Sequence, residues 1–203
     1  MKDKERFLEI CKNITREGID DLIKWLEDGD FYTAPASAKY HLAVEGGLLR
    51  HSLNVYDELK RLLSAYPEVK ASDETAAIIA LFHDLCKINL YVKESRNRKN
   101  KYGKWESYEC YSYDEKFCYG GHGSKSVYLA GHFIKLTPEE ATAIQCHMSS
   151  WEDGASKQVG SAYEQFPLAW LLHVADESAT FILETEEIKE NEEDTGLSQE
   201  TGN

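Results

Sequence analysis

The chain has 203 residues, of which 42% are apolar and 11% aromatic, and its formal net charge is −13. This size and composition are ordinary for one soluble globular domain, and no apolar run approaches the roughly 18 residues that a membrane span needs. The N-terminus MKDKERFLEI lacks the apolar core of a signal peptide, so we expect a cytoplasmic protein with no membrane partner. Five scattered cysteines without a CxxC pair fit reduced thiols better than a disulfide framework or a structural zinc site.

The N-terminal third of the sequence has the pattern of helices. Apolar residues recur at helical spacing in 6–14 and 19–29, and a proline among small residues in 31–40 interrupts the pattern. A long helix is predicted over Gly47–Ala65, ending before Pro67.

The middle of the chain combines a buried helix with a hairpin. A helix is predicted from Ser72, its N-cap, to Asp84, and its AAIIALF run is apolar on all sides, which indicates burial. Alternating aromatic and polar residues in KWESYECYSY then predict a small β-hairpin within 91–119. Residues 93–104 carry six bases and one acid, and we expect them at the tip of this hairpin.

Helices resume near His122. Thr137, followed by proline and by Glu140 at the third helical position, is a well-formed helix start. The last helix is predicted over 167–183. The tail 184–203 has eight acids and one lysine, so we expect it to be solvated and disordered, and without it the net charge is about −6. The sequence therefore predicts one all-α domain over 1–183 with a hairpin insertion.

Polar residues interrupt several apolar faces in this pattern. His51 shares a helical stripe with Leu48 and Val55, and Asp176 follows Leu172 by four residues. An unpaired buried carboxylate costs several kcal/mol, so it shifts its pKa, finds a cation or binds a metal. His51 and Asp176 are therefore candidate metal ligands.

The adjacent pair His83 and Asp84 poses the same problem at the end of the buried helix. His122 at a helix start and His147 at a helix end are placed to reach the same site. Any one histidine alone is more often a satisfied core residue than a ligand. The combination of four histidines and two aspartates favours a metal site. Three histidines are not counted among the ligands: His41, His132 and His173, the last of which could also serve as the ligand or as its hydrogen-bonded support.

The order of these residues resembles a known family. The pattern H…HD…H…H…D is similar to that of the HD-domain metal-dependent phosphohydrolases, and FYTAPASAKYHLAVEGGLLRHSLNV is similar to the start of the HD domain in YhaM-type 3′–5′ exoribonucleases. The similarity runs from about Phe31 to Ala179. Cys86 stands where the family often has glycine, and the chain has no room for the separate oligonucleotide-binding domain of those exoribonucleases, which puts processive RNA degradation in doubt.

The resemblance implies an all-α HD-domain helical bundle that holds two divalent metal ions (Mn, Fe, Ni, Zn or Mg) between its helices. Asp84 would bridge the ions, and the other ligands would divide into His51, His83 and Asp176 at one ion and His122 and His147 at the other. Two such ions activate a water and neutralise charge on a phosphoryl oxygen, so a metal-bound hydroxide would attack phosphorus directly.

The implied substrate is a phosphoester of a nucleotide or short oligonucleotide. Lys87 resembles a family lysine near the substrate phosphate, and its alternative is a solvent-facing lysine. Arg96 and Arg98 offer the fork geometry that phosphate favours, on a hairpin that could act as a lid. Tyr102 and Trp105 could stack on a base.

Two other classes of protein stay open. One is a non-catalytic, metal-dependent nucleotide-binding or sensing module. The other is a structural metal site, which is disfavoured because structural sites are usually closed, whereas six ligands for two ions leave coordination positions open. The sequence fixes neither the substrate nor the oligomeric state.

Overall fold

The computed structural model describes residues 2–114, 120–149 and 156–185. Within them the chain forms eight α-helices: α1 (Lys2–Cys11), α2 (Ile19–Asp28), α3 (Gly47–Ala65), α4 (Asp73–Phe82), α5 (His122–Gly131), α6 (Pro138–Cys146), α7 (Ser156–Gln165) and α8 (Pro167–Ser178). One hairpin, β1 (Tyr91–Lys99) and β2 (Trp105–Tyr113), supplies the strands of this part of the chain. The prediction of an all-α fold with a small β insertion is confirmed. No helix among the described residues has the length and apolar character to cross a membrane.

The helix starts follow from their capping residues. The Ser72 hydroxyl accepts the backbone N–H of Thr75 at 3.0 Å. Thr137 and Glu140 form a reciprocal capping box at the start of α6. The predicted end of α4 at Asp84 is wrong, because α4 ends at Phe82 and the chain passes through a turn into the short 3-10 segment η1 (Leu85–Lys87). His83 is the C-cap of α4 and still has helical backbone angles (φ −61°, ψ −31°), whereas Asp84 lies in the turn beyond it.

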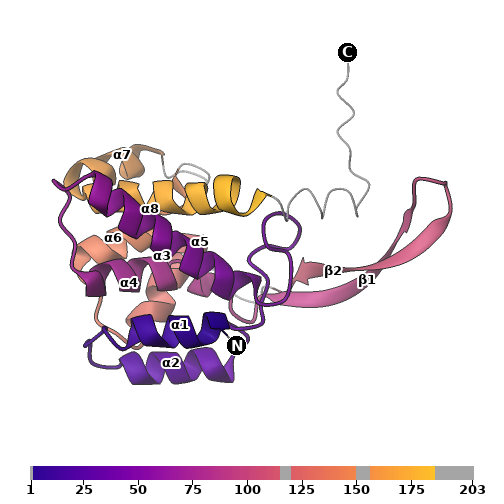
Figure 1. Cartoon of the computed structure of the whole chain (residues 1–203), viewed down its shortest axis with the longest axis horizontal. Coiled ribbons are helices and arrows are strands. Elements are labelled where there is room, and N and C mark those ends of the chain that lie inside the picture. Colours follow the sequence, from indigo (N-terminus) through magenta and orange to yellow (C-terminus); the bar gives the residue numbers. More distant parts are fainter. Residues whose placement is uncertain (1, 115–119, 150–155, 186–203) are drawn as a thin grey trace, which may run out of the picture.

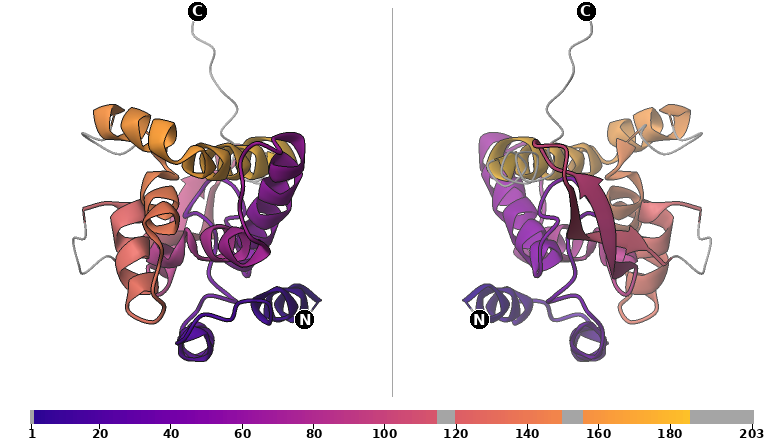
Figure 2. Two further views of the ribbon diagram at one scale, coloured as in Figure 1. Left: turned by 90° about the vertical axis from the view of Figure 1, so that its left-hand side faces the viewer. Right: turned by 90° about the vertical axis from the view of Figure 1, so that its right-hand side faces the viewer.

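Helix α4 is the centre of the fold, as its apolar sequence predicts. Ile78 and Leu81 pack in a core with α1, α2 and α3, while Ile79 and Ala80 pack in a second core with α3, α6 and α8. Helices α1 and α2 lie on one side of α3 and α4, and α8 lies on the other (Figures 1 and 2). Polar groups at the end of α4 are consequently surrounded by helices.

A glycine fixes the loop before α3. A Cβ atom on Gly47 would lie 2.1 Å from the carbonyl oxygen of Leu42 and 2.9 Å from the backbone nitrogen of Ala36. Only glycine permits this approach. The GG pair in the sequence thus lets the loop that carries His41 lie directly against the start of α3.

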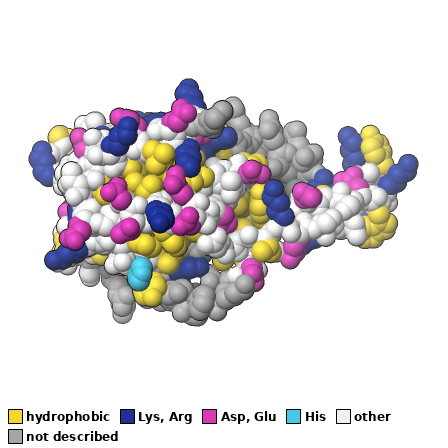
Figure 3. Space-filling view, turned by 90° about the horizontal axis from the view of Figure 1, so that it is seen from below, with side chains coloured by type: hydrophobic (Ala, Val, Ile, Leu, Met, Phe, Trp, Pro, Cys, Tyr) yellow, Lys and Arg dark blue, Asp and Glu magenta, His cyan; other side chains and the backbone are white. Residues whose placement is uncertain are grey.

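The hairpin is antiparallel, with Tyr91 opposite Tyr113 and Lys99 opposite Trp105. It projects away from the helices rather than folding over them (Figure 1), so it does not form a lid in this structure. Its bases run along β1 as well as through the turn, which differs from the prediction that they lie at the tip. Lys and Arg side chains are gathered towards the far end of the hairpin, whereas both charge signs mix over the helical body (Figure 3). The end of the predicted insertion, 115–119, lies outside the described residues.

The C-terminal helical segment changes its type within the predicted range 167–183. The last helix gives way after Ser178 to a π-helical turn, η3 (Ala179–Leu183). Glu184, predicted as the first residue of a solvated tail, is only 2% exposed. The rest of that tail, 186–203, lies outside the described residues.

Candidate metal centre

The six predicted ligands come from five places in the fold. They are His51 in α3, His83 and Asp84 after α4, His122 at the start of α5, His147 after α6, and Asp176 in α8. All are buried except His122, which is half-buried. Together with Cys86 they form three overlapping groups, in each of which one ligand atom per residue lies within 4.8 Å of the others: His51, His83 and Asp84; His83, His147 and Asp176; and Asp84, Cys86 and His122.

Asp84 links these groups because its two oxygens face different neighbours. Its Oδ2 lies 3.7 Å from Nε2 of His51 and 3.4 Å from Nε2 of His83. Its Oδ1 lies 3.6 Å from Nε2 of His147 and 3.7 Å from Sγ of Cys86. One carboxylate therefore faces two sides of the cluster, as a bridging ligand does.

The histidine rings are oriented through their other nitrogen. Nδ1 of His83 donates to the Ala80 carbonyl at 2.8 Å, and Nδ1 of His147 donates to the Ile144 carbonyl at 2.7 Å. In both cases a histidine just past a helix end folds back on the carbonyl three residues earlier. Because Nδ1 carries the proton, Nε2 is a lone-pair donor that points into the cluster.

These nitrogens fit a cation. Nε2 of His51, His83 and His147 is buried and forms no hydrogen bond within the part of the chain that the structure describes. A buried polar atom without a partner is costly, and here the nearest groups are aspartate oxygens. A divalent cation between these imidazole and carboxylate donors would satisfy both kinds of atom, and the mixed set suits transition metals.

Comparison with known families decides what this cluster belongs to. The HD domain family matches residues 48–180, about two thirds of the chain and all six predicted ligands. The chain belongs to the HD domain family. HD domains bind divalent metals and are generally hydrolases. The match does not confirm the narrower resemblance to YhaM-type exoribonucleases. No curated protein and no solved structure matches the chain.

Neighbouring cationic groups favour the ionised form of Asp84 and Asp176 in this HD domain despite their burial. Burial raises a carboxyl pKa, but Lys87, His83 and His147 together hold the pKa of Asp84 well below its ordinary value. Contacts with His51 lower the pKa of Asp176 against the same effect of burial. Burial opposes a charge on His51, yet the carboxylates of Asp176 and Glu184 raise its pKa to about 10. In the metal-free protein these two carboxylates therefore favour the charged form of His51.

Lys87 belongs to the cluster rather than to the surface. It is buried, and its Nζ lies 2.6 Å from Oδ2 of Asp84. The alternative of a solvent-facing lysine is therefore wrong. Burial lowers the pKa of an ammonium, but Asp84 more than offsets this and raises the pKa of Lys87.

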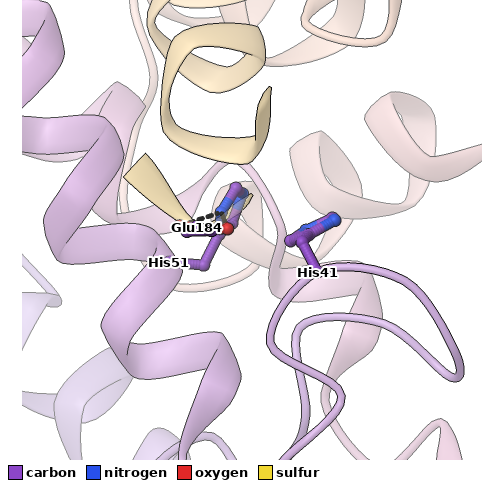
Figure 4. A group of neighbouring side chains, drawn as sticks. All are labelled: His41, His51 and Glu184. Atoms are coloured by element: carbon purple, nitrogen blue, oxygen red, sulfur yellow. Dashed lines mark hydrogen bonds and ion pairs between the residues drawn. The ribbon is translucent and has the colours of Figure 1, made fainter. Parts of the chain in front are cut away.

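The structure adds two residues that sequence reasoning placed elsewhere. His41, excluded from the site, packs its ring 4.9 Å from that of His51, and Glu184, assigned to the tail, contacts Nδ1 of His51 (Figure 4). The histidine-containing turn before the GG pair was the available signal for His41. Composition pointed the other way for Glu184, since an acid at the edge of an acidic run is usually solvated.

The two other excluded histidines lie outside the cluster. His132 is exposed at the end of α5. Nδ1 of His173 lies 2.7 Å from the backbone carbonyl of His147, and Tyr163 stacks on its ring. His173 therefore supports the segment that carries His147, and it belongs to none of the possible ligand groups found among the described residues.

Arg96 and Arg98 lie apart from the cluster, on the hairpin. They line a surface pocket of about 640 Å³ between the strands and the 38–45 loop, together with Lys93, Tyr108 and Tyr111. Arg98 is paired with Glu106 and covers the ring of Tyr108 at 4.8 Å. Tyr102 and Trp105 are exposed at the far turn, so the aromatic side chains that line the pocket are not the pair expected from the sequence.

Proposed function

We propose that this HD domain is a metal-dependent phosphohydrolase that cleaves a phosphoester of a nucleotide or short oligonucleotide. The observation that carries the proposal is the arrangement around Asp84, whose two oxygens face separate histidines with bare, buried Nε2 atoms. This arrangement supports two divalent ions, one held by His51, His83 and Asp176 and one by His122 and His147, with Asp84 shared. Such ions supply an activated water and neutralise charge on the phosphoryl oxygens.

Lys87 is proposed as the residue that binds the substrate phosphate beside Asp84. Its ammonium group is at the edge of the cluster, on the same carboxylate oxygen that faces His51 and His83. A phosphoryl group bound to ions at Asp84 would lie within reach of this charge. The low exposure of Lys87 strengthens that contact, because the surrounding dielectric is lower than in water.

The pocket at the foot of the hairpin is proposed to hold the remainder of the substrate. Arg96 and Arg98 supply guanidinium groups for a phosphate, and Tyr108 and Tyr111 supply aromatic faces for a base. The pocket borders the loop that carries His41, whose ring packs on His51. A substrate longer than one nucleotide would extend from the metal centre into this pocket, which agrees with the resemblance to YhaM-type HD domains.

The decisive experiment is a substrate panel on protein loaded in turn with Mn, Fe, Ni, Zn and Mg. It should include mono-, di- and cyclic nucleotides and short oligonucleotides. We expect about two ions per chain and turnover of at least one class. Activity should fall to the metal-free background in H83A and D84A, while H132A, which removes an exposed histidine, should keep it.

The pocket is tested separately by charge-matched variants of the same hairpin. R96Q/R98Q should raise KM for an oligonucleotide roughly tenfold or more, from the loss of charge-assisted hydrogen bonds. K101Q/K104Q removes two charges at the turn, outside the pocket lining, and should change KM little. Equal increases of KM in the two double variants would mean that the hairpin acts only through general electrostatic attraction.

The second candidate function is a non-catalytic module that binds a nucleotide through its metal ions. It is favoured by the ion pair between Lys87 and Asp84, because this pair engages the carboxylate that a hydrolytic metal centre needs as a ligand. Stoichiometric metal and nucleotide binding without turnover across the panel would establish this function instead.

A further inference from the structure

Glu184 is a buried carboxylate that contacts the cluster at His51. Its Oε1 and Oε2 lie 3.1 and 3.3 Å from Nδ1 of His51, and Asn54, one helical turn further along α3, donates its Nδ2 to Oε1 at 2.9 Å. Figure 4 shows Glu184 against the imidazole ring of His51, with His41 beyond it. The carboxylate thus has a fixed place beside a single predicted ligand.

A π-helical turn brings Glu184 to this place. In η3 the backbone N–H of Glu184 donates to the carbonyl of Ala179 at 3.1 Å, a bond over five residues instead of four. Ala179 and Glu184 are buried, whereas Leu183 is half exposed. In a regular α-helix, Leu183 would follow Ala179 on the buried face and Glu184 would turn away. π turns inside helices are rare and frequent at functional sites.

The contact decides which nitrogen of His51 can bind a metal. When Nδ1–H donates to Glu184, the lone pair is on Nε2, which lies 3.1 Å from Oδ1 of Asp176 and 3.7 Å from Oδ2 of Asp84. His83 and His147 obtain the same orientation from backbone carbonyls. Among these three rings, His51 is the one held by a carboxylate, which also makes its Nε2 a more basic ligand.

We propose that Glu184 is a positioning residue of the metal centre, which fixes the ring and tautomer of His51 and thereby tightens metal binding. The π turn of the C-terminal segment is then part of the site and not only the end of a helix. The inference rests on the metal ions of the proposed function and is independent of turnover.

The test is the dissociation constant of Mn²⁺ or Zn²⁺ for the full chain, measured by competition with a chelating dye. E184A should weaken binding roughly 10–100-fold, the usual range for a lost partner of a ligating histidine. E184Q should weaken it less, because an amide oxygen still accepts Nδ1–H but carries no charge. N54A should have a smaller effect in the same direction. E68Q removes an exposed glutamate outside the cluster and is the matched control.

Two further readouts separate positioning from a structural role. If Glu184 only stabilised the fold, E184Q would lower the melting temperature of the metal-free protein and leave the dissociation constant of the folded variant unchanged. The Nδ1–H resonance of His51, assigned by its loss in H51A, should move in E184Q.

The outcomes are distinct. A dissociation constant within twofold of the wild type in both E184Q and E184A overturns this inference alone. Binding that depends on Glu184 without turnover of any phosphoester overturns the proposed hydrolase alone. No metal binding by the wild-type chain overturns both.

Discussion

Nζ of Lys87 lies 2.6 Å from Oδ2 of Asp84, the same oxygen that faces Nε2 of His51 and His83. A metal ion held by these histidines and the ammonium group of Lys87 would both draw on this oxygen. The lysine therefore compensates the Asp84 charge in the metal-free protein, and a bound dication would take over this role.

The first prediction follows from this exchange. Lys87→Met should lower the free energy of unfolding of the metal-free protein by about 3 kcal/mol, because a buried charge loses its partner. Saturating metal should restore part of the loss. Urea unfolding with and without Mn²⁺ measures both values. Lys60→Met, which removes a surface partner of Asp73, is the control and should cost about 1 kcal/mol or less under both conditions. An equal loss in Lys87→Met with and without metal would contradict the exchange.

Metal removal gives the second prediction. At one hundred times the dissociation constant a ligand adds about 2.7 kcal/mol to stability, which corresponds to about 5–10 °C in the melting temperature of a chain of this length. Scanning calorimetry before and after EDTA treatment should show this difference. It should disappear in D84A and persist in H132A. A shift that survives D84A would place the stabilising ion outside the cluster.

The third prediction concerns the contact between α5 and α6. A Cβ atom on Gly123 would lie 2.2 Å from the carbonyl oxygen of Gln145, so Gly123→Ala must push the two helices apart. We expect a loss of about 1–3 kcal/mol, as in other overpacked sites, and fewer bound ions per chain because His122 moves with the helix start. Gly131→Ala, at the other end of α5, meets nothing within 4 Å and should be neutral or slightly stabilising. Chemical denaturation and metal analysis of the two variants test the pair, and similar values for both would refute the close contact.

The fourth prediction is a pH dependence distant from the cluster. Glu140 is fully buried; burial raises its pKa, but Arg16 and the capping contacts with Thr137 lower it below the ordinary value of 4.5. A lowered pKa means that the unfolded chain binds the proton more tightly, so this contribution to stability is present above about pH 4.5 and is lost as the pH falls below it.

Glu140→Gln should therefore cost about 2 kcal/mol at pH 7, the typical loss for hydrogen bonds to a charged group. The difference from the wild type should shrink steadily below pH 4.5. Denaturant unfolding at a series of pH values between 3 and 7 measures it. A difference that stays constant over this range would assign the effect to packing instead of charge.

Periodicity and caps were sufficient to predict most of the helical framework. Ser72 and Thr137 begin α4 and α6 as expected, and the apolar run of α4 is buried on all sides. The inward placement of His51 and Asp176 followed from their helical stripes. These features depend on local spacing, which the sequence records directly.

Other features depend on contacts between distant segments. The π turn that buries Glu184 leaves no period in the sequence, and its acidic surroundings favour the opposite interpretation. The position of His41 beside His51 depends on a loop that crosses Gly47 and on Leu42 with a φ of 44°. The alternation in β2 predicts a hairpin but not its outward direction, since neither strand has a buried residue and β1 is exposed at all but two positions.

The hairpin divides the proposed ligands equally along the chain. His51, His83 and Asp84 precede its turn at Asn100–Lys104, and His122, His147 and Asp176 follow it. A chain cut in this exposed turn would give two fragments, each with half of the proposed ligands. Helices α3 and α4 of the first fragment pack against α6 and α8 of the second. Reassembly of the fragments would then be linked to the ions, so that metal availability controls complementation of a split protein.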